Sequence, residues 1–225
     1  MRVEIWSDIA CPWCYVGKAR FEKALEAFPH RDQVEVVHRS FELDPNRAKG
    51  DVQPVISMLT KKYGMSAAQA QAGEENLGTQ AAAEGLEYRT RDRDHGNTFD
   101  MHRLLHLAKA RGRQDELIQI FYRANFAEER SVFAEGAERL VELAVAAGLD
   151  ADDVRADERE AAELGANGVP FFVLDRKYGV SGAQPAEVFT QALTQAWGER
   201  PPLKLIEDNG AEACGPDGCA VPQQH

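Results

Sequence analysis

The order of apolar and polar positions predicts one α/β domain interrupted by helices. Residues 3–6 read as a short strand, and the apolar positions between 16 and 28 are spaced as one face of a helix. A second strand at 34–38 gives the order β-α-β. Apolar stripes at helical spacing then recur from about 53 to about 156. Beyond them, the pattern predicts a short helix at about 158–164, a hairpin of strands at 171–174 and 178–181, and a last helix at about 185–197.

This order divides the chain into four segments. Residues 1–50 form the first part of the α/β domain, and 51–156 form an all-helical insertion domain. Residues 157–200 return to the same domain with the order α-β-β-α. Residues 201–225 are polar, show no period and read as a C-terminal tail.

Composition narrows the functional classes. The chain has 225 residues, a formal net charge of −11 and no block of Lys or Arg, which argues against nucleic acid or an anionic membrane as partner. Four cysteines are too few for a disulfide scaffold of this length. Glu4 and Asp8 interrupt the start where a signal peptide would be apolar, and we find no apolar run of about 18 residues. We therefore expect a cytoplasmic protein.

The motif Cys11-Pro12-Trp13-Cys14 carries the clearest chemistry, because it lies between a predicted strand and a predicted helix. Unpaired N–H groups at a helix N-terminus favour a thiolate, the form that attacks disulfides. We expect Cys11 to be the nucleophile and Cys14, one turn further in, to be shielded and to resolve the mixed disulfide. Pro12 suits a first helical turn, and Trp13 adds an aromatic face without charge.

Two other interpretations of this motif exist, a zinc knuckle and a pair of inert core cysteines. A zinc ribbon usually has its second Cys pair within about 20 residues. The only other pair, Cys214 and Cys219, lies some 200 residues away. We therefore favour redox chemistry, and we expect neither a metal nor a cofactor.

A second group of motifs supports a family resemblance. Gly168-Val169-Pro170 precedes the strand at 171–174, and a proline in that place can be cis. Together with residues 11–18, 41–45 and 178–185, in this order, it closely resembles the FrnE-like branch of the DsbA family, over residues 1 to about 197. The resemblance implies a thioredoxin-like fold split by the helical insertion, with a redox-active Cys11/Cys14 pair. It also implies a cis-Pro170 facing that pair and substrate contacts at Val169 and Pro170.

Three further polar residues are candidates for a role in catalysis or metal binding. Asp8 lies three residues before Cys11 and could shuttle a proton or raise the thiol pKa, although a solvated cap at the strand end is an equally good interpretation. His102 and His106 share one face of a predicted helix. Without a Glu between them in the H-E-x-x-H arrangement, capping or packing is favoured over metal binding.

The predicted function is protein thiol-disulfide exchange, as oxidoreductase or disulfide isomerase, with a role in oxidative stress defence. Its partners would be thiol or disulfide proteins, a small thiol or thioredoxin-type electron donor, and a second copy of the chain, since family members often dimerise. One alternative is a glutathione-dependent isomerase of the 2-hydroxychromene-2-carboxylate type, which would need no complete Cys pair. Another is a redox-sensing or zinc-holding module without turnover.

The C-terminal pair, Cys214 and Cys219, lies outside the resemblance. Gly-Pro-Asp-Gly between the two cysteines is strong turn chemistry, so their sulfur atoms can meet. A passive bridge and a metal-binding tail are alternatives. The hypothesis is that this second redox pair exchanges electrons with Cys11/Cys14, because the tail is long enough to reach them.

Overall fold

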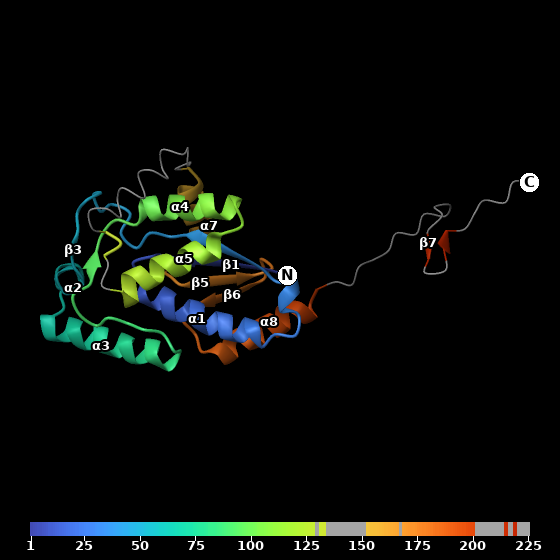
Figure 1. Ribbon diagram of the computed structural model, residues 1–225, viewed down its shortest axis with the longest axis horizontal. Coiled ribbons are helices and arrows are strands. Elements are labelled where there is room, and N and C mark those ends of the chain that lie inside the picture. The colour runs from blue at the N-terminus through green and yellow to red at the C-terminus, as the bar shows by residue number, and fades with distance from the viewer. Residues whose placement is uncertain (129–130, 134–151, 167, 201–213, 216–217, 220–225) are drawn as a thin grey trace, which may run out of the picture.

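A four-stranded mixed sheet is the centre of the molecule (Figure 1). The computed structural model describes residues 1–128, 131–133, 152–166, 168–200, 214–215 and 218–219. The sheet has the order β2-β1-β5-β6 and consists of β2 (Glu35–Ser40), β1 (Arg2–Ser7), β5 (Phe171–Leu174) and β6 (Tyr178–Ser181). β1 runs parallel to β2 and antiparallel to β5, and β6 is antiparallel to β5. The β-α-β unit and the hairpin predicted from the sequence are confirmed.

Helices cover both faces of this sheet (Figure 1). Alternate strand residues such as Val3 and Phe172 pack against α1 (Pro12–Glu26) and α8 (Ala186–Gly198). The other alternation, including Trp6 and Phe171, packs against α7 (Asp152–Glu163) on the opposite face. Strands buried on both sides explain why the apolar runs at 3–6 and 171–174 show little polar alternation.

Within its described residues, the segment between β2 and α7 is mainly helical. It contains α2 (Val55–Tyr63), α3 (Ala67–Ala83), α4 (Phe99–Ala110) and α5 (Gln114–Tyr122), and α5 continues into the π-helical turn η2 (Arg123–Ala127). Two strands of two residues each, β3 (Gln53–Pro54) and β4 (Asp94–His95), pair antiparallel within it. The pattern did not predict them, because two residues cannot show a period. The apolar stripe at 140–145 lies outside the described residues.

The remaining elements are short. A 3-10 turn, η1 (Arg31–Gln33), leads into β2, and α7 begins six residues before the helix that the sequence predicts at 158. β7 (Cys214–Gly215) and β8 (Gly218–Cys219) form a separate antiparallel pair. Among the described helices, none is both long and apolar enough to cross a membrane.

Helix α5 closes the β2 edge of the sheet. The side-chain amide of Gln114 accepts a hydrogen bond from the His38 N–H at 3.0 Å and donates one to the His38 carbonyl at 2.9 Å. It thus replaces part of a neighbouring strand. Next to it, buried Lys18 of α1 pairs with Asp115 at 2.9 Å, and Asp115 contacts the His38 ring at 3.3 Å. These contacts join the inserted helices to both β2 and α1.

Candidate active site

The Cys-Pro-Trp-Cys motif forms the start of α1, as the sequence predicts. Cys11 is the N-cap residue and Pro12 lies in the first turn, where its missing N–H leaves no helical bond unmade. The Cys11 N–H donates to the Asp8 carbonyl at 3.2 Å, and the Cys14 N–H donates to the Cys11 carbonyl at 3.0 Å. No acidic side chain lies in the first turn of α1. The Trp13 side chain, between the two cysteines, is 38% exposed.

Both cysteines of the motif are free thiols, and both are buried. Cys11 is 4% exposed and Cys14 is 1% exposed. Burial raises the pKa of Cys14 well above its ordinary value, and the hydrogen bond and charge of Cys11 raise it further. Cys14 is therefore held as a thiol, and its burial agrees with the shielding predicted for it.

The Val169–Pro170 peptide bond is cis, which confirms the sequence prediction. The Cys11 thiol donates to the Val169 carbonyl at 3.6 Å, so the two predicted motifs meet at this point. Pro170 packs so closely on α1 that a Cβ atom at Gly17 would lie 2.9 Å from its ring. The Pro170 carbonyl in turn accepts from the Gly182 N–H at 2.8 Å, which ties this loop to the end of β6.

Asp8 is buried, being 1% exposed, so the interpretation as a solvated cap is wrong. Its carboxylate accepts from the N–H groups of Leu43 at 2.8 Å and Ala10 at 3.2 Å, and it contacts His102 at 3.4 Å. Burial opposes ionisation, but His102, the Leu43 amide and the Thr98 hydroxyl together lower the pKa of Asp8. Asp8 is thus a fixed negative charge that helps to raise the pKa of Cys14.

The two histidines of α4 contact different acids. His102 is fully buried against Asp8. His106 lies 3.2 Å from Asp157 of α7 and 3.0 Å from the Ser40 hydroxyl of β2. Both contacts of His106 use the same ring nitrogen, Nε2, which does not match the geometry of a proton-relay triad. Within the described ranges, no cluster of three or more His, Cys, Asp or Glu side chains could hold a metal ion.

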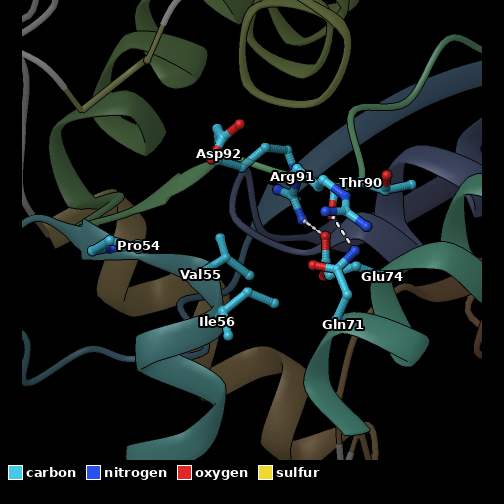
Figure 2. A pocket seen from close by; sticks show the side chains of 9 residues that line it. Pro54, Val55, Ile56, Gln71, Glu74, Thr90, Arg91 and Asp92 are labelled. Atoms are coloured by element: carbon cyan, nitrogen blue, oxygen red, sulfur yellow. Dashed lines mark hydrogen bonds and ion pairs between the residues drawn. The ribbon is translucent and has the colours of Figure 1, made fainter. Parts of the chain in front are cut away.

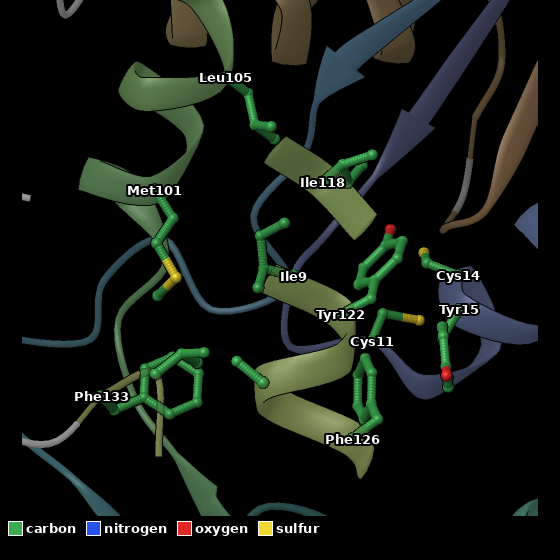
Figure 3. Packing of buried hydrophobic residues seen from close by; sticks show 12 residues of the cluster. Ile9, Cys11, Cys14, Tyr15, Met101, Leu105, Ile118, Tyr122, Phe126 and Phe133 are labelled. Atoms are coloured by element: carbon green, nitrogen blue, oxygen red, sulfur yellow. The ribbon is translucent and has the colours of Figure 1, made fainter. Parts of the chain in front are cut away.

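The inserted helices supply an aromatic wall beside the cysteines (Figure 3). Phe126 of η2 stacks on Tyr15 of α1 with ring centroids 5.3 Å apart, and Tyr122 packs against both rings. The Asn125 amide donates to the Ile9 carbonyl at 2.9 Å, just before the motif. Sequence reasoning missed Asn125 and Phe126, because a π-helical turn breaks the period of 3.6 on which a helical face is recognised.

A polar pocket of about 280 Å³ lies further along the insertion, between α2, α3 and residues 90–93 (Figure 2). Arg93 and Glu74 form a buried ion pair in its wall, and the Tyr88 hydroxyl bonds to both side chains. The ring of Tyr88 stacks on Phe126 and packs against the cluster that contains Cys11. Tyr88 therefore connects the ion pair in the pocket wall to the aromatic wall.

The remaining predicted site residues are Cys214 and Cys219. The backbone places them directly opposite each other in the β7–β8 pair, next to the Gly215–Gly218 pair. Their side chains lie outside the described part of the chain, and so does the chain that joins them to α8.

Comparison with known proteins gives the family. The model of the DSBA-like thioredoxin domain matches residues 2–194, and the chain belongs to this family. A probable DsbA oxidoreductase from Streptomyces coelicolor is 78% identical, with a TM-score of 0.83 over 99% of this chain and 100% of the other. At a coarse level the chain is thus an oxidoreductase of the DsbA type. No match was found among proteins with curated descriptions.

Two more distant structures share the fold. A 2-hydroxychromene-2-carboxylate isomerase is 16% identical, with a TM-score of 0.58 over 87% of this chain and 95% of its own. The cytosolic disulfide reductase DsbM from Pseudomonas aeruginosa, solved with glutathione, is 15% identical, with a TM-score of 0.55 over 87% and 98%. At these identities the likeness concerns the fold alone.

Proposed function

We propose that this chain is a protein thiol-disulfide oxidoreductase or disulfide isomerase in which Cys11 is the attacking thiolate. The observation that carries the proposal is the position of Cys11, at the N-cap of α1 and 3.6 Å from the carbonyl that precedes cis-Pro170. The helix N-terminus favours the anion, and the neighbouring loop offers backbone groups to a substrate strand. Val169 and Pro170 are the substrate contacts in this proposal.

The reaction proceeds by two exchanges of sulfur partners. The Cys11 thiolate attacks one sulfur of a substrate disulfide, and the other sulfur leaves as a thiolate that takes up a proton. Cys14 then attacks the Cys11 sulfur, releases the substrate as a thiol and leaves a Cys11–Cys14 disulfide. One thioredoxin-type dithiol, or two molecules of a small thiol, becomes oxidised to a disulfide and returns the pair to its reduced form. In isomerisation a second substrate thiol, rather than Cys14, attacks the mixed disulfide.

Several finer points belong to the same proposal. Two thiols in the motif favour protein disulfide exchange over the chromene-type isomerase, which needs no resolving cysteine. The motif order supports the FrnE-like branch, with a role in oxidative stress, and the few cysteines suit a cytoplasmic location. No cofactor is required, because both redox groups belong to the chain.

The test is reduction of insulin disulfides by dithiothreitol with the full chain. Cys11→Ser should abolish the catalysed rate, whereas Cys14→Ser should accumulate mixed disulfides at Cys11. Alkylation at pH 7 supplies an internal control, because iodoacetamide should label Cys11 faster than Cys14 in the same molecule. Full activity in Cys11→Ser would show that Cys11 is not the nucleophile. A zinc-loaded reduced protein without turnover would favour the metal-holding alternative.

Cys214 and Cys219 are proposed as a second redox pair that exchanges electrons with Cys11 and Cys14. In a hairpin closed by a two-residue turn, the pair next to the turn is hydrogen-bonded, and the following pair is the closer, non-hydrogen-bonded one. Cys214 and Cys219 occupy this second position, the spacing that suits a cross-strand disulfide.

The matching experiment follows the redox state of Cys11 and Cys14 after peroxide treatment. Full-length protein and a Cys214→Ser, Cys219→Ser variant are compared during oxidation and recovery. The proposal expects slower recovery in the variant. Identical time courses would leave the hairpin as a structural clip.

A further inference from the structure

Two neighbouring hydroxyl groups, one of which lies beside the resolving cysteine, are buried in the described part of the protein. Tyr122, the last residue of α5, is 1% exposed, and Ser7, the last residue of β1, is 3% exposed. Neither hydroxyl oxygen has a hydrogen-bonding partner among the residues that the structure describes. The Ser7 hydroxyl lies close enough to that of Tyr122 to lower the pKa of Tyr122. An unsatisfied buried hydroxyl destabilises a fold, so a pair of them calls for a functional reason.

The hydroxyl of Tyr122 faces the sulfur of Cys14. Figure 3 shows the hydroxyl end of its ring turned toward Cys14, within one cluster of buried side chains that also contains Cys11. Burial raises the pKa of Tyr122 well above its ordinary value, and among charges the Cys14 thiolate is the largest further cause. Tyr122 therefore remains a phenol, which can donate a hydrogen bond, when Cys14 ionises.

The position of Tyr122 is fixed by its neighbours rather than by its hydroxyl. Its ring packs against Tyr15 at 5.7 Å and against Phe126 at 5.9 Å. The π-helical turn that follows is held to the loop before the motif by Asn125. A donor that is held in place before charge appears loses no reorganisation energy when the charge forms.

We propose that the Tyr122 hydroxyl is a hydrogen-bond donor for the Cys14 thiolate that forms during resolution of the mixed disulfide, and that the neighbouring Ser7 hydroxyl supports it by donating to the Tyr122 oxygen. The inference rests on the proposed disulfide exchange and assigns two residues to its second step. While Cys14 is a thiol, a weak acceptor, the Tyr122 hydroxyl stays unpaired as a donor. When Cys14 becomes an anion, the Tyr122 hydroxyl gains a strong acceptor, so the stabilisation is larger in the transition state than in the ground state.

The step balances without another reactant. Cys14 loses its proton, and its sulfur attacks the Cys11 sulfur that is bound to the substrate. The new Cys11–Cys14 bond forms as the bond between Cys11 and the substrate sulfur breaks. The substrate sulfur leaves with the electron pair and is protonated, so the net transfer of the proton is from Cys14 to the substrate thiol.

Other groups also change the pKa of Cys14, and most of them raise it, whereas a hydrogen-bond donor would lower it. Cys11 faces it from α1 and raises its pKa, and the Asp8 carboxylate acts in the same direction. The Asp8 backbone N–H opposes them by lowering the pKa of Cys14. His102 of α4 contacts the Asp8 carboxylate, and any effect it has on Cys14 is exerted through Asp8. Tyr122 adds a neutral donor that, like the Asp8 backbone N–H, opposes the effects of burial and negative charge on Cys14.

The test measures resolution apart from attack. Full-length protein carrying Cys214→Ser and Cys219→Ser, which retains only the Cys11 and Cys14 thiols, is reduced and mixed with an aromatic disulfide such as dithiobis-nitrobenzoate. The first coloured thiolate reports attack by Cys11, and the second reports resolution by Cys14. Tyr122→Phe should leave the first phase unchanged and slow the second about tenfold, and Ser7→Ala should slow it by a smaller factor. The pH profile of the second phase should move upward by about one unit in Tyr122→Phe.

Stability and a matched control separate this role from packing. Because each variant removes an unpaired hydroxyl, its urea midpoint should be unchanged or higher. Tyr15→Phe, whose hydroxyl lies 3.4 Å from the Glu87 carbonyl, alters the same ring cluster and should leave the second phase at the parent rate. A parent protein with both phases, but with the same second phase in Tyr122→Phe, would overturn the inference alone. A parent protein without the first phase would instead overturn the proposed function.

Discussion

His95 is a buried histidine whose environment disfavours its charged form. It is 6% exposed on β4, next to the ring of Phe133, and its Nε2 has no hydrogen-bond partner within the described residues. Burial, and then the charge of Arg47, lower its pKa from 6.5 to about 4. Asp8 and Asp44 act in the opposite direction and do not offset this effect.

Because of this lowered pKa, the free energy of unfolding should decrease as the pH falls into the mildly acidic range. Below about pH 6.5 the unfolded chain binds a proton at His95 that the folded chain does not, so the contribution to stability is complete above that pH. It is lost as the pH falls toward 4, and it amounts to roughly 3 kcal/mol. His95→Phe should therefore show a flatter decrease in the free energy of unfolding between pH 7 and pH 4, measured by urea titration. An unchanged slope in the variant would contradict this assignment.

At the residue scale, the sequence predicts the groups whose local context defines them. Cys11, Cys14 and Pro170 stand out because strand, motif and helix follow one another along the chain. Asp8 was recognised, but its partner His102 lies on another helix, so its burial and charge could not be foreseen. Tyr122 and Ser7 carry no motif, and only the tertiary packing brings the Tyr122 hydroxyl near Cys14 and the Ser7 hydroxyl beside Tyr122.

At the scale of elements, the contact between α1 and the cis-proline loop depends on Gly17. A Cβ atom there would lie 2.9 Å from the Pro170 ring and 3.3 Å from the backbone of Ala183. Gly17→Ala should push the loop away from Cys11, lower the free energy of unfolding by about 1–3 kcal/mol and slow insulin reduction.

Gly73→Ala is the matched control for this substitution. Gly73 is also helical, in α3, but a Cβ atom there would meet nothing within 4 Å. Alanine favours helix by about 1 kcal/mol over glycine, so this variant should be more stable and equally active. Equal losses in both variants, measured by urea unfolding, would show that the contact with Pro170 has no special importance.

The elements that the sequence predicts well are those with a clear period. The β1–α1–β2 unit and the β5–β6 hairpin agree with the pattern within one or two residues at each end. The early start of α7 was missed, because residues 152–157 are mostly polar and show no apolar stripe. The role of Gln114 at the β2 edge depends on which strand α5 lies beside, which local periodicity does not encode.

For the molecule as a whole, Asp157 joins three elements through one buried carboxylate. It accepts from Arg39 and the Ser40 N–H of β2, each at 2.9 Å, and contacts His106 of α4 at 3.2 Å. Asp157→Ala would leave the Arg39 charge and the Ser40 amide without this partner. The free energy of unfolding should fall by about 3–5 kcal/mol, measured by urea titration.

An exposed acid provides the comparison for Asp157. Asp32 is 95% exposed and pairs with Arg31 at 3.8 Å. Asp32→Ala should change the free energy of unfolding by less than about 0.5 kcal/mol. A similar small effect in Asp157→Ala would mean that the buried carboxylate does not hold the helices to the sheet.

The central position of β1 has a consequence for synthesis on the ribosome. β1 pairs with β2 soon after both have emerged, but its other neighbour is β5, where Val3 lies opposite Leu174. The sheet cannot close until most of the chain has been translated, and such distant pairing delays folding. During that interval Cys11 and Cys14 are exposed without the loop of Pro170 and the wall of Tyr122 that later bury them. Newly made chains are therefore the form most vulnerable to unwanted disulfides and the form most dependent on chaperones.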